Sequence, residues 1–202
     1  MIDLRKEGDL WYVTLTRPEK ANSLTKDMLR ELAEIAANAS AAKALILTGA
    51  GRVFSAGADL DEARAGLAVD PVWEQLSAAI VNAPCLTIAA LNGTLAGGAF
   101  GMALACDLRI SVPTAKFFYP VMKLGFLPQP SDPARLSALV GPARAKMILM
   151  AGQKIDADTA LAWGLVDRVT APEALLNTAR ELAADVLSAS PDHIAAIKAL
   201  HA

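Results

Sequence analysis

Short apolar runs of strand length alternate with helix-forming segments through the first half of the chain. The runs at residues 44–48 (ALILT) and 85–91 (CLTIAAL) have the length and composition of buried strands. The segments at residues 26–39 and 72–81 read as helices, the first with its apolar side chains at helical spacing. Strands that alternate with helices in this way predict an α/β architecture.

Further segments extend this pattern toward the C-terminus. Residues 4–6 and 10–16 predict a hairpin joined by the turn Glu7-Gly8-Asp9, and residues 107–112 and 116–119 predict another pair of strands. Beyond Asp132 the sequence predicts helices at residues 133–139, 143–151, 158–163, 173–187 and from about 192 onward, interrupted by a short strand at 165–169.

Length and segment order favour one domain. A chain of 202 residues can bury a single sizeable core, and neither a low-complexity segment nor a linker divides it. We expect one domain over residues 1–202, with a core at 1–140 and a helical C-terminal portion at 141–202.

Charge and hydropathy narrow the class of function. A formal net charge of -2 with interspersed signs gives no electrostatic footprint for nucleic acid or an anionic membrane. No apolar stretch approaches the roughly 20 residues that span a bilayer, and the N-terminus lacks the apolar core of a signal peptide, so we expect a cytoplasmic protein.

Cys85 and Cys106 lie in apolar runs and are interpreted as buried hydrophobic residues rather than a disulfide. His193 and His201 are the only histidines, so we expect no metal site.

Two glycine-bearing segments carry the strongest chemical signal. Residues 54–59 (FSAGAD) and 92–99 (NGTLAGGA) each follow a strand-like run and lead into helix-forming sequence. Glycines let the backbone approach a ligand closely, and a helix N-terminus adds unpaired N–H donors. Either segment alone reads as an ordinary turn. The ordered pair favours an oxyanion hole, in which preorganised N–H groups stabilise negative charge on a carbonyl oxygen.

With these motifs the chain resembles the enoyl-CoA hydratase/isomerase (crotonase) superfamily over nearly its whole length. The resemblance rests on residues 15–24 (LTRPEKANSL), 54–60, 90–98, 106–109 (CDLR) and 162–166 (AWGLV). It implies an α/β fold of repeated ββα units wound into a spiral. A helical C-terminal region follows, shortened here, because family members usually continue through further helices. It also implies a homotrimer or a dimer of trimers.

The resemblance further implies an acyl-CoA thioester as ligand, with coenzyme A as part of the substrate and no separate cofactor. The thioester oxygen would lie between the backbone N–H groups of Ala58 and Gly98. The resemblance implies that the remainder of coenzyme A binds near Lys20, Ala21, Ala56, Asp59 and Leu60. Lys20 suits a phosphate as a flexible point charge on an exposed loop, and it reads equally as a solvated surface lysine.

The chain differs from hydratases of the family at the two positions where they carry catalytic glutamates. Hydratases of the family activate water with two glutamates, one three residues after the central glycine and one after the proline of the next strand. Aligning Gly98 and Pro120 with these landmarks puts Gly101 and Val121 at the two acid positions. Neither residue transfers a proton, so the hydratase mechanism should lose a general acid–base contribution of roughly 10²–10⁴-fold.

Several residues are candidates for the acid/base role of the missing glutamates. Asp132 lies near the position where some isomerases and dehalogenases of the superfamily carry an acid, and we assign it as the tentative acid/base. The competing interpretation is an N-cap, because Pro133 follows it. Tyr119 could donate a phenolic proton or simply pack on a strand. Asp59 is predicted to cap a helix, and Asp107 is interpreted as structural.

The sequence therefore predicts an acyl-CoA enzyme that stabilises a thioester enolate. Isomerisation or decarboxylation is favoured over hydration, because decarboxylation needs no base and isomerisation needs only one mobile acid/base. A catalytically silent acyl-CoA-binding protein is the alternative, and thioester hydrolysis is a third.

Overall fold

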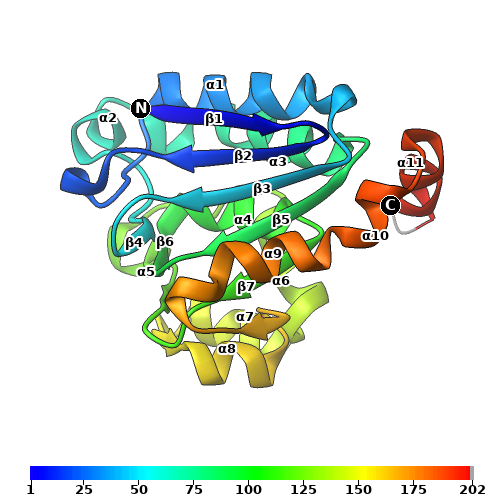
Figure 1. Ribbon diagram of the computed structural model, residues 1–202. Helices are drawn as coiled ribbons and strands as arrows, with labels where there is room; N and C mark the ends of the chain where they lie inside the picture. The colour runs from blue at the N-terminus through cyan, green and yellow to red at the C-terminus, as the bar shows by residue number, and fades with distance from the viewer. Residues whose placement is uncertain (201–202) are drawn as a thin grey trace.

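The computed structural model describes residues 1–200 and contains two sheets with helices packed around them (Figure 1). The larger, six-stranded sheet runs in the order β1 (Ile2–Glu7), β2 (Leu10–Leu15), β3 (Ala44–Gly49), β5 (Leu86–Leu91), β7 (Leu108–Ser111) and β10 (Arg168–Val169). The β1–β2 pair is an antiparallel hairpin, and the other neighbours pair in parallel. The predicted hairpin and central strands are confirmed.

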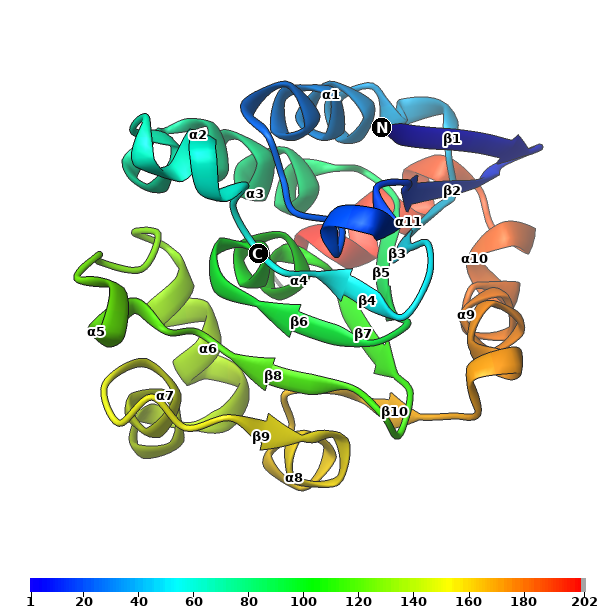
Figure 2. The ribbon, with the colours of Figure 1, turned by 90° about the vertical axis from the view of Figure 1, so that its left-hand side faces the viewer.

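A second, four-stranded sheet lies beside the first (Figure 2). Its strands are β4 (Val53–Ser55), β6 (Thr94–Ala96), β8 (Lys116–Phe118) and β9 (Ile155–Asp156), with β8 and β9 antiparallel and the others parallel. Successive long strands are each followed by a short strand of this sheet and then by helix, in the orders β3-β4-α2, β5-β6-α4 and β7-β8-α5. This is the repeated ββα arrangement that the resemblance implied.

The helices cover the sheets and form the C-terminal portion. They are α1 (Lys26–Ala37), α2 (Leu60–Arg64), α3 (Val72–Asn82), α4 (Phe100–Ala105), α5 (Val121–Leu124), α6 (Asp132–Val140), α7 (Pro142–Leu149), α8 (Ala157–Trp163), α9 (Leu175–Leu182), α10 (Ala184–Ser188) and α11 (Pro191–Ala199). Short 3₁₀ turns are η1 (Pro18–Lys20), η2 (Ala39–Ala41), η3 (Leu67–Val69), η4 (Gly97–Ala99) and η5 (Pro172–Ala174). Within residues 1–200 no helix combines the length and apolar character needed to cross a bilayer.

Several sequence-predicted boundaries were wrong. The strand predicted at 165–169 shortens to β10, and the single helix predicted at 173–187 divides into η5, α9 and α10. At the second division the N–H of Ala183 donates to the carbonyls of both Ala179 and Arg180, at 3.2 and 3.1 Å. The short strands β6 and β9 and helix α5 were not predicted, because two to four residues give too little periodicity. The last two residues of the predicted domain, His201 among them, lie outside the described residues.

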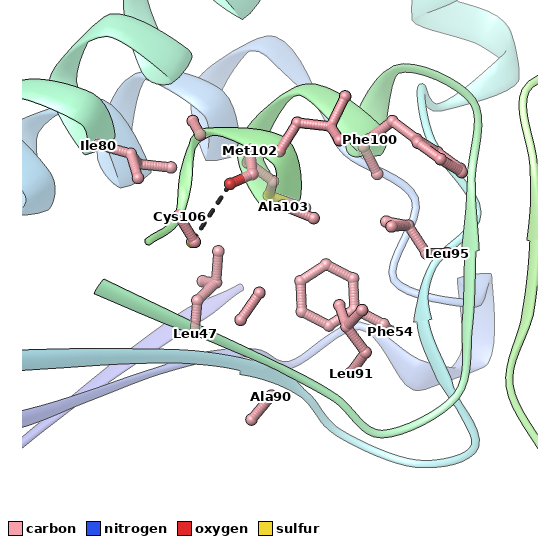
Figure 3. Close-up of a cluster of buried hydrophobic side chains, with 14 of the residues drawn as sticks. Leu47, Phe54, Ile80, Ala90, Leu91, Leu95, Phe100, Met102, Ala103 and Cys106 are labelled. Atoms are coloured by element: carbon pink, nitrogen blue, oxygen red, sulfur yellow. Dashed lines mark hydrogen bonds between the residues drawn. The ribbon is translucent and has the colours of Figure 1, made fainter. Parts of the chain in front are cut away.

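The core fills the space between the two sheets and is closed by α4, every residue of which is buried. Figure 3 shows Leu47 of β3, Phe54 of β4 and Leu91 of β5 below this helix. The Sγ of Cys106, just after α4, donates to the carbonyl of Met102 at 3.3 Å. Cys85 and Cys106 are both buried free thiols, as predicted, and burial raises the pKa of Cys85 to about 11.

Candidate active site

The two glycine segments meet backbone to backbone at the ends of β4 and β6. Gly57 has a φ of +94° and Gly97 a φ of +57°, values that an L side chain rarely adopts. A Cβ added to Gly57 would stand 2.9 Å from the carbonyl oxygen of Ala96 and 3.4 Å from the backbone nitrogen of Gly98. No side chain therefore separates the residues around Gly57 from those around Gly98.

Asparagine side chains hold the first segment in place. The amide of Asn22 donates to the carbonyls of Ala50 and Val53 at 2.9 and 2.7 Å, and its Oδ1 accepts from the N–H of Arg17 at 2.9 Å. Asn92 accepts from the N–H of Gly49 at 3.0 Å. Because these bonds tie the N-terminal loop and the second segment to the turn after β3, the three pieces of backbone form one rigid unit.

Among the turn and loop hydrogen bonds of residues 1–200, none is donated by the backbone N–H of Ala58 or of Gly98. Leu24 is hydrogen-bonded to the residues on either side of Ala58. Its N–H donates to the carbonyl of Gly57 and its carbonyl accepts from the N–H of Asp59, each at 2.8 Å. Gly98 lies in the first turn of η4, where no preceding helical carbonyl can accept from its N–H. Two such donors on touching backbones are the element from which an oxyanion hole is built.

These donors line a cavity of about 140 Å³. The sequence-predicted residues Ala56, Ala58, Leu60 and Gly98 all border it. The other lining residues are Ala63, Ala68, Trp73, Ala96, Gly97, Phe118, Tyr119, Pro120, Val121, Leu124, Phe126, Leu127 and Gln129. The wall is therefore apolar apart from the backbone donors, a phenol and an amide.

Trp73, which sequence reasoning missed, packs directly on Gly98. Its Nε1 donates to the carbonyl of Leu67 at 2.8 Å, which fixes the indole. A Cβ on Gly98 would stand 3.1 to 3.3 Å from atoms of the six-membered ring. A side chain at position 98 would therefore require the indole of Trp73 to shift by a few tenths of an ångström.

Asp132 lies behind this cavity and is only 1% exposed. Its Oδ2 accepts from the Oη of Tyr119 at 3.0 Å, whereas its Oδ1 is buried and has no hydrogen-bond partner among residues 1–200. A Cβ added to Gly101 would stand 3.0 Å from Asp132 Oδ1. The carboxylate thus occupies space that a side chain at position 101 would enter.

The N-cap interpretation of Asp132 was wrong. Ser131 is the N-cap of α6, and Asp132 is the first helical residue, with its carboxylate turned to Tyr119. The backbone N–H and the hydroxyl of Ser131 donate to Glu74 at 3.1 and 2.6–2.8 Å. These bonds tie the start of α6 to α3 and fix the position of Asp132.

Burial raises the pKa of Asp132 to about 7, against a lowering effect of the hydrogen bond from Tyr119. The charge of Glu74 raises it further, and that of Arg135 lowers it. Burial, together with the neighbouring Asp132 carboxylate, raises the pKa of Tyr119 far above its usual value. A carboxyl group that titrates near neutral pH is suited to accept a proton and return it.

The residues predicted to bind the remainder of coenzyme A are only partly brought together. The carbonyl of Ala21 accepts from the N–H of Ala56 at 3.0 Å, and Leu60 stands beside the cavity at 73% exposure. Lys20 is exposed and Asp59 half-buried, and neither borders the cavity. Asp59 pairs with Arg17 at 2.8 Å, and the bond from Arg17 lowers its pKa.

Two other acids have structural partners. Asp59 accepts from the N–H of Asp61 at 3.1 Å and caps α2, as predicted. Asp107 accepts from the N–H and the hydroxyl of Thr87 at 2.8 and 2.9 Å, and from Lys198 at 2.9 Å. These bonds tie β5, β7 and α11 together, which agrees with the structural interpretation of Asp107.

Known proteins resemble the chain in sequence and in fold. A family model for enoyl-CoA hydratase/isomerase matches residues 5–202. The short-chain-enoyl-CoA hydratase of Clostridium acetobutylicum is 38% identical over 201 residues, covering 93% of this chain and 76% of that protein. The carnitinyl-CoA dehydratase of Citrobacter koseri is 37% identical, covering 97% of this chain and 78% of that protein.

Among solved structures, Pseudomonas aeruginosa DspI matches with a TM-score of 0.91 and 34% identity, covering 98% of this chain and 85% of that chain. The crystal structure of enoyl-CoA hydratase from Bacillus anthracis matches with a TM-score of 0.88 and 33% identity, covering 98% and 80%. The crotonase-like α/β fold is therefore confirmed, and this chain belongs to the enoyl-CoA hydratase/isomerase family.

Proposed function

We propose that this protein is an acyl-CoA isomerase that holds a thioester enolate against the N–H groups of Ala58 and Gly98. The observation that carries the proposal is the buried carboxylate of Asp132, which has an unpartnered Oδ1 beside Gly101. The family match and relatives named for enoyl-CoA and carnitinyl-CoA substrates support a coenzyme A thioester as ligand.

The oxyanion donors supply the larger part of the proposed stabilisation. Negative charge develops on the thioester oxygen as the α-carbon loses a proton. Removing one donor from such a site typically slows catalysis by about 10²–10³-fold. Both donors here belong to the backbone of packed elements, so they are already aligned before the substrate binds.

Hydration is disfavoured because water has no pair of carboxylates to hold it. Val121 borders the cavity with an apolar side chain, and Gly101 has none. A single carboxyl group titrating near pH 7 instead suits a 1,3-proton shift. In such a shift Asp132 is the net acceptor of the α-proton of a 3-enoyl thioester, and a proton given back at the γ-carbon moves the double bond to the 2-position.

Decarboxylation is the second candidate. No aspartate or glutamate is among the residues that line the cavity. A carboxylated acyl group would lose carbon dioxide and leave its electron pair in the same enolate, so no base would have to remove a proton from carbon.

The test incubates the protein with 3-enoyl-, crotonyl- and malonyl-type CoA thioesters. The proposal expects double-bond migration with the 3-enoyl thioester and a loss of about 10²-fold or more in Asp132→Asn. Asp158→Asn, a change at an exposed aspartate on α8, is the matched control. Loss of carbon dioxide alone supports the second candidate. Coenzyme A binding without any turnover would instead identify a catalytically silent binding protein, and rapid hydration would refute the assignment of the acids.

A further inference from the structure

We infer that the phenol of Tyr119 is the group that contacts the substrate, and that Asp132 exchanges protons with the substrate through it. This inference rests on the proposed function and adds a catalytic residue to it. Tyr119 borders the cavity that contains Ala58 and Gly98, whereas Asp132 is not among its lining residues. The hydroxyl of Tyr119 is hydrogen-bonded both to Asp132 Oδ2 and to Gln129, another lining residue, and so links the cavity wall to the carboxylate.

The hydroxyl is held in the arrangement that a relay needs. It donates to Asp132 Oδ2 at 3.0 Å and accepts from the backbone N–H of Gln129 at 3.4 Å. The ring of Tyr119 stacks on Phe100 of α4, with centroids 5.4 Å apart and planes inclined by 25°. Because Phe100 is fully buried, this stack connects the phenol to the core.

The proposed step balances without a co-reactant. As the C–H bond at the α-carbon breaks, its proton passes to Tyr119 Oη, and the proton already on Oη passes to Asp132 Oδ2. The C–H electron pair moves into the thioester to give the enolate. The reverse transfer delivers the proton from Oη to the γ-carbon while Asp132 returns its proton to the phenol.

The relay explains why an acid can lie outside the cavity. A free tyrosinate never forms, because Asp132 takes the phenolic proton as the phenol receives another. The raised pKa of Tyr119 thus does not prevent transfer, since the net proton acceptor is a carboxylate that titrates near neutral pH.

The decisive variant is Tyr119→Phe, which removes the hydroxyl and retains the ring on Phe100. We expect kcat for the 3-enoyl thioester to fall by about 10²-fold or more, with KM and coenzyme A binding changed less than about threefold. Tyr12→Phe alters the only other tyrosine, which lies on β2, and is the matched control. Tyr119→Gln gives a second variant without a phenol, and a thermal melt checks that each variant is folded.

Two further measurements separate a relay from a structural hydroxyl. The double variant Tyr119→Phe/Asp132→Asn should lose no more than Asp132→Asn alone, because both changes interrupt one proton path. Exchange of the α-proton of a saturated acyl-CoA in D₂O, followed by NMR, should also be lost in Tyr119→Phe. Wild-type kcat and exchange in Tyr119→Phe would overturn the relay and leave the proposed function standing. Failure of the wild-type protein to turn over any thioester would overturn both.

Discussion

Replacing Asp132 with asparagine should stabilise the protein in a strongly pH-dependent way. The folded-state pKa of Asp132 is raised from 3.8 to about 7 because its carboxyl group is buried. Between these values the folded chain holds a proton that the unfolded chain has released, so the free energy of unfolding falls as pH rises through this window. The shift of about three pKa units corresponds to a destabilisation of about 4 kcal/mol above pH 7.

Asparagine cannot ionise, and its amide oxygen can still accept from Tyr119. Urea denaturation of wild type and Asp132→Asn at several values from pH 4 to pH 8 measures the difference directly. Relative to its value at pH 4, the advantage of the variant should grow with pH and approach about 4 kcal/mol at pH 8. Any fixed cost of the buried amide cancels in this comparison between pH values. Asp158→Asn, at an exposed aspartate on α8, is the control for replacing an aspartate away from the site.

A flat difference for Asp132→Asn across the same range would refute the reasoning, because it would mean that Asp132 titrates alike in both states. A difference that shrinks as pH rises would mean that the folded protein favours the ionised form. Either result would remove the physical basis for a carboxyl group that exchanges protons near pH 7.

Three other predictions concern the packing of Gly98, the binding of coenzyme A and the oligomeric state. Gly98→Ala should lower turnover because its methyl group meets the ring of Trp73 at 3.1 Å, and adding Trp73→Phe should restore part of it, as measured by kcat of single and double variants. If Lys20 contacts a phosphate, Lys20→Ala should weaken coenzyme A binding several-fold at low salt and little at high salt, in calorimetric titrations. A homotrimer or a dimer of trimers is expected by sedimentation, and a single monomeric species at micromolar concentration would contradict it.

The sequence was informative about the fold wherever elements were long. β2, β3 and β5 are runs of buried residues, and their β-like composition made them readable as strands. The strands of the second sheet are two or three residues long and take their conformation from their neighbours. β6 is an example, because it lies within a segment whose glycines resemble a plain turn.

The sequence predicted that the two glycine segments come together, but it did not predict how Asp132 and Tyr119 are arranged. The two glycine motifs and their strand contexts predicted that the segments come together, whereas the choice of Ala58 and Gly98 as donors was implied by the family resemblance. Asp132 and Tyr119 are 13 residues apart in sequence and lie in different elements. Asp-Pro at a helix start is a capping signal, and the contacts that place the carboxylate inward here, Ser131 with Glu74 and Asp132 with Tyr119, join residues far apart in the sequence or in different elements. Trp73 gave no local signal at all.

The different anchoring of the two halves of the site has an evolutionary consequence. The two donors that we propose for the oxyanion are main-chain groups, Ala58 between β4 and α2 and Gly98 between β6 and the wholly buried α4, so replacing their side chains with other residues does not remove the N–H groups. The carboxyl group, by contrast, belongs to a side chain, that of Asp132 at the start of α6. At position 101 this chain has only a hydrogen atom, and a Cβ added there would stand 3.0 Å from Asp132 Oδ1 and 3.1 Å from Ser77 Oγ. A substitution can therefore remove the acid or supply it from another position while the two backbone donors stay in place, so the proton-transfer half of the site is the half that can change without a change of fold.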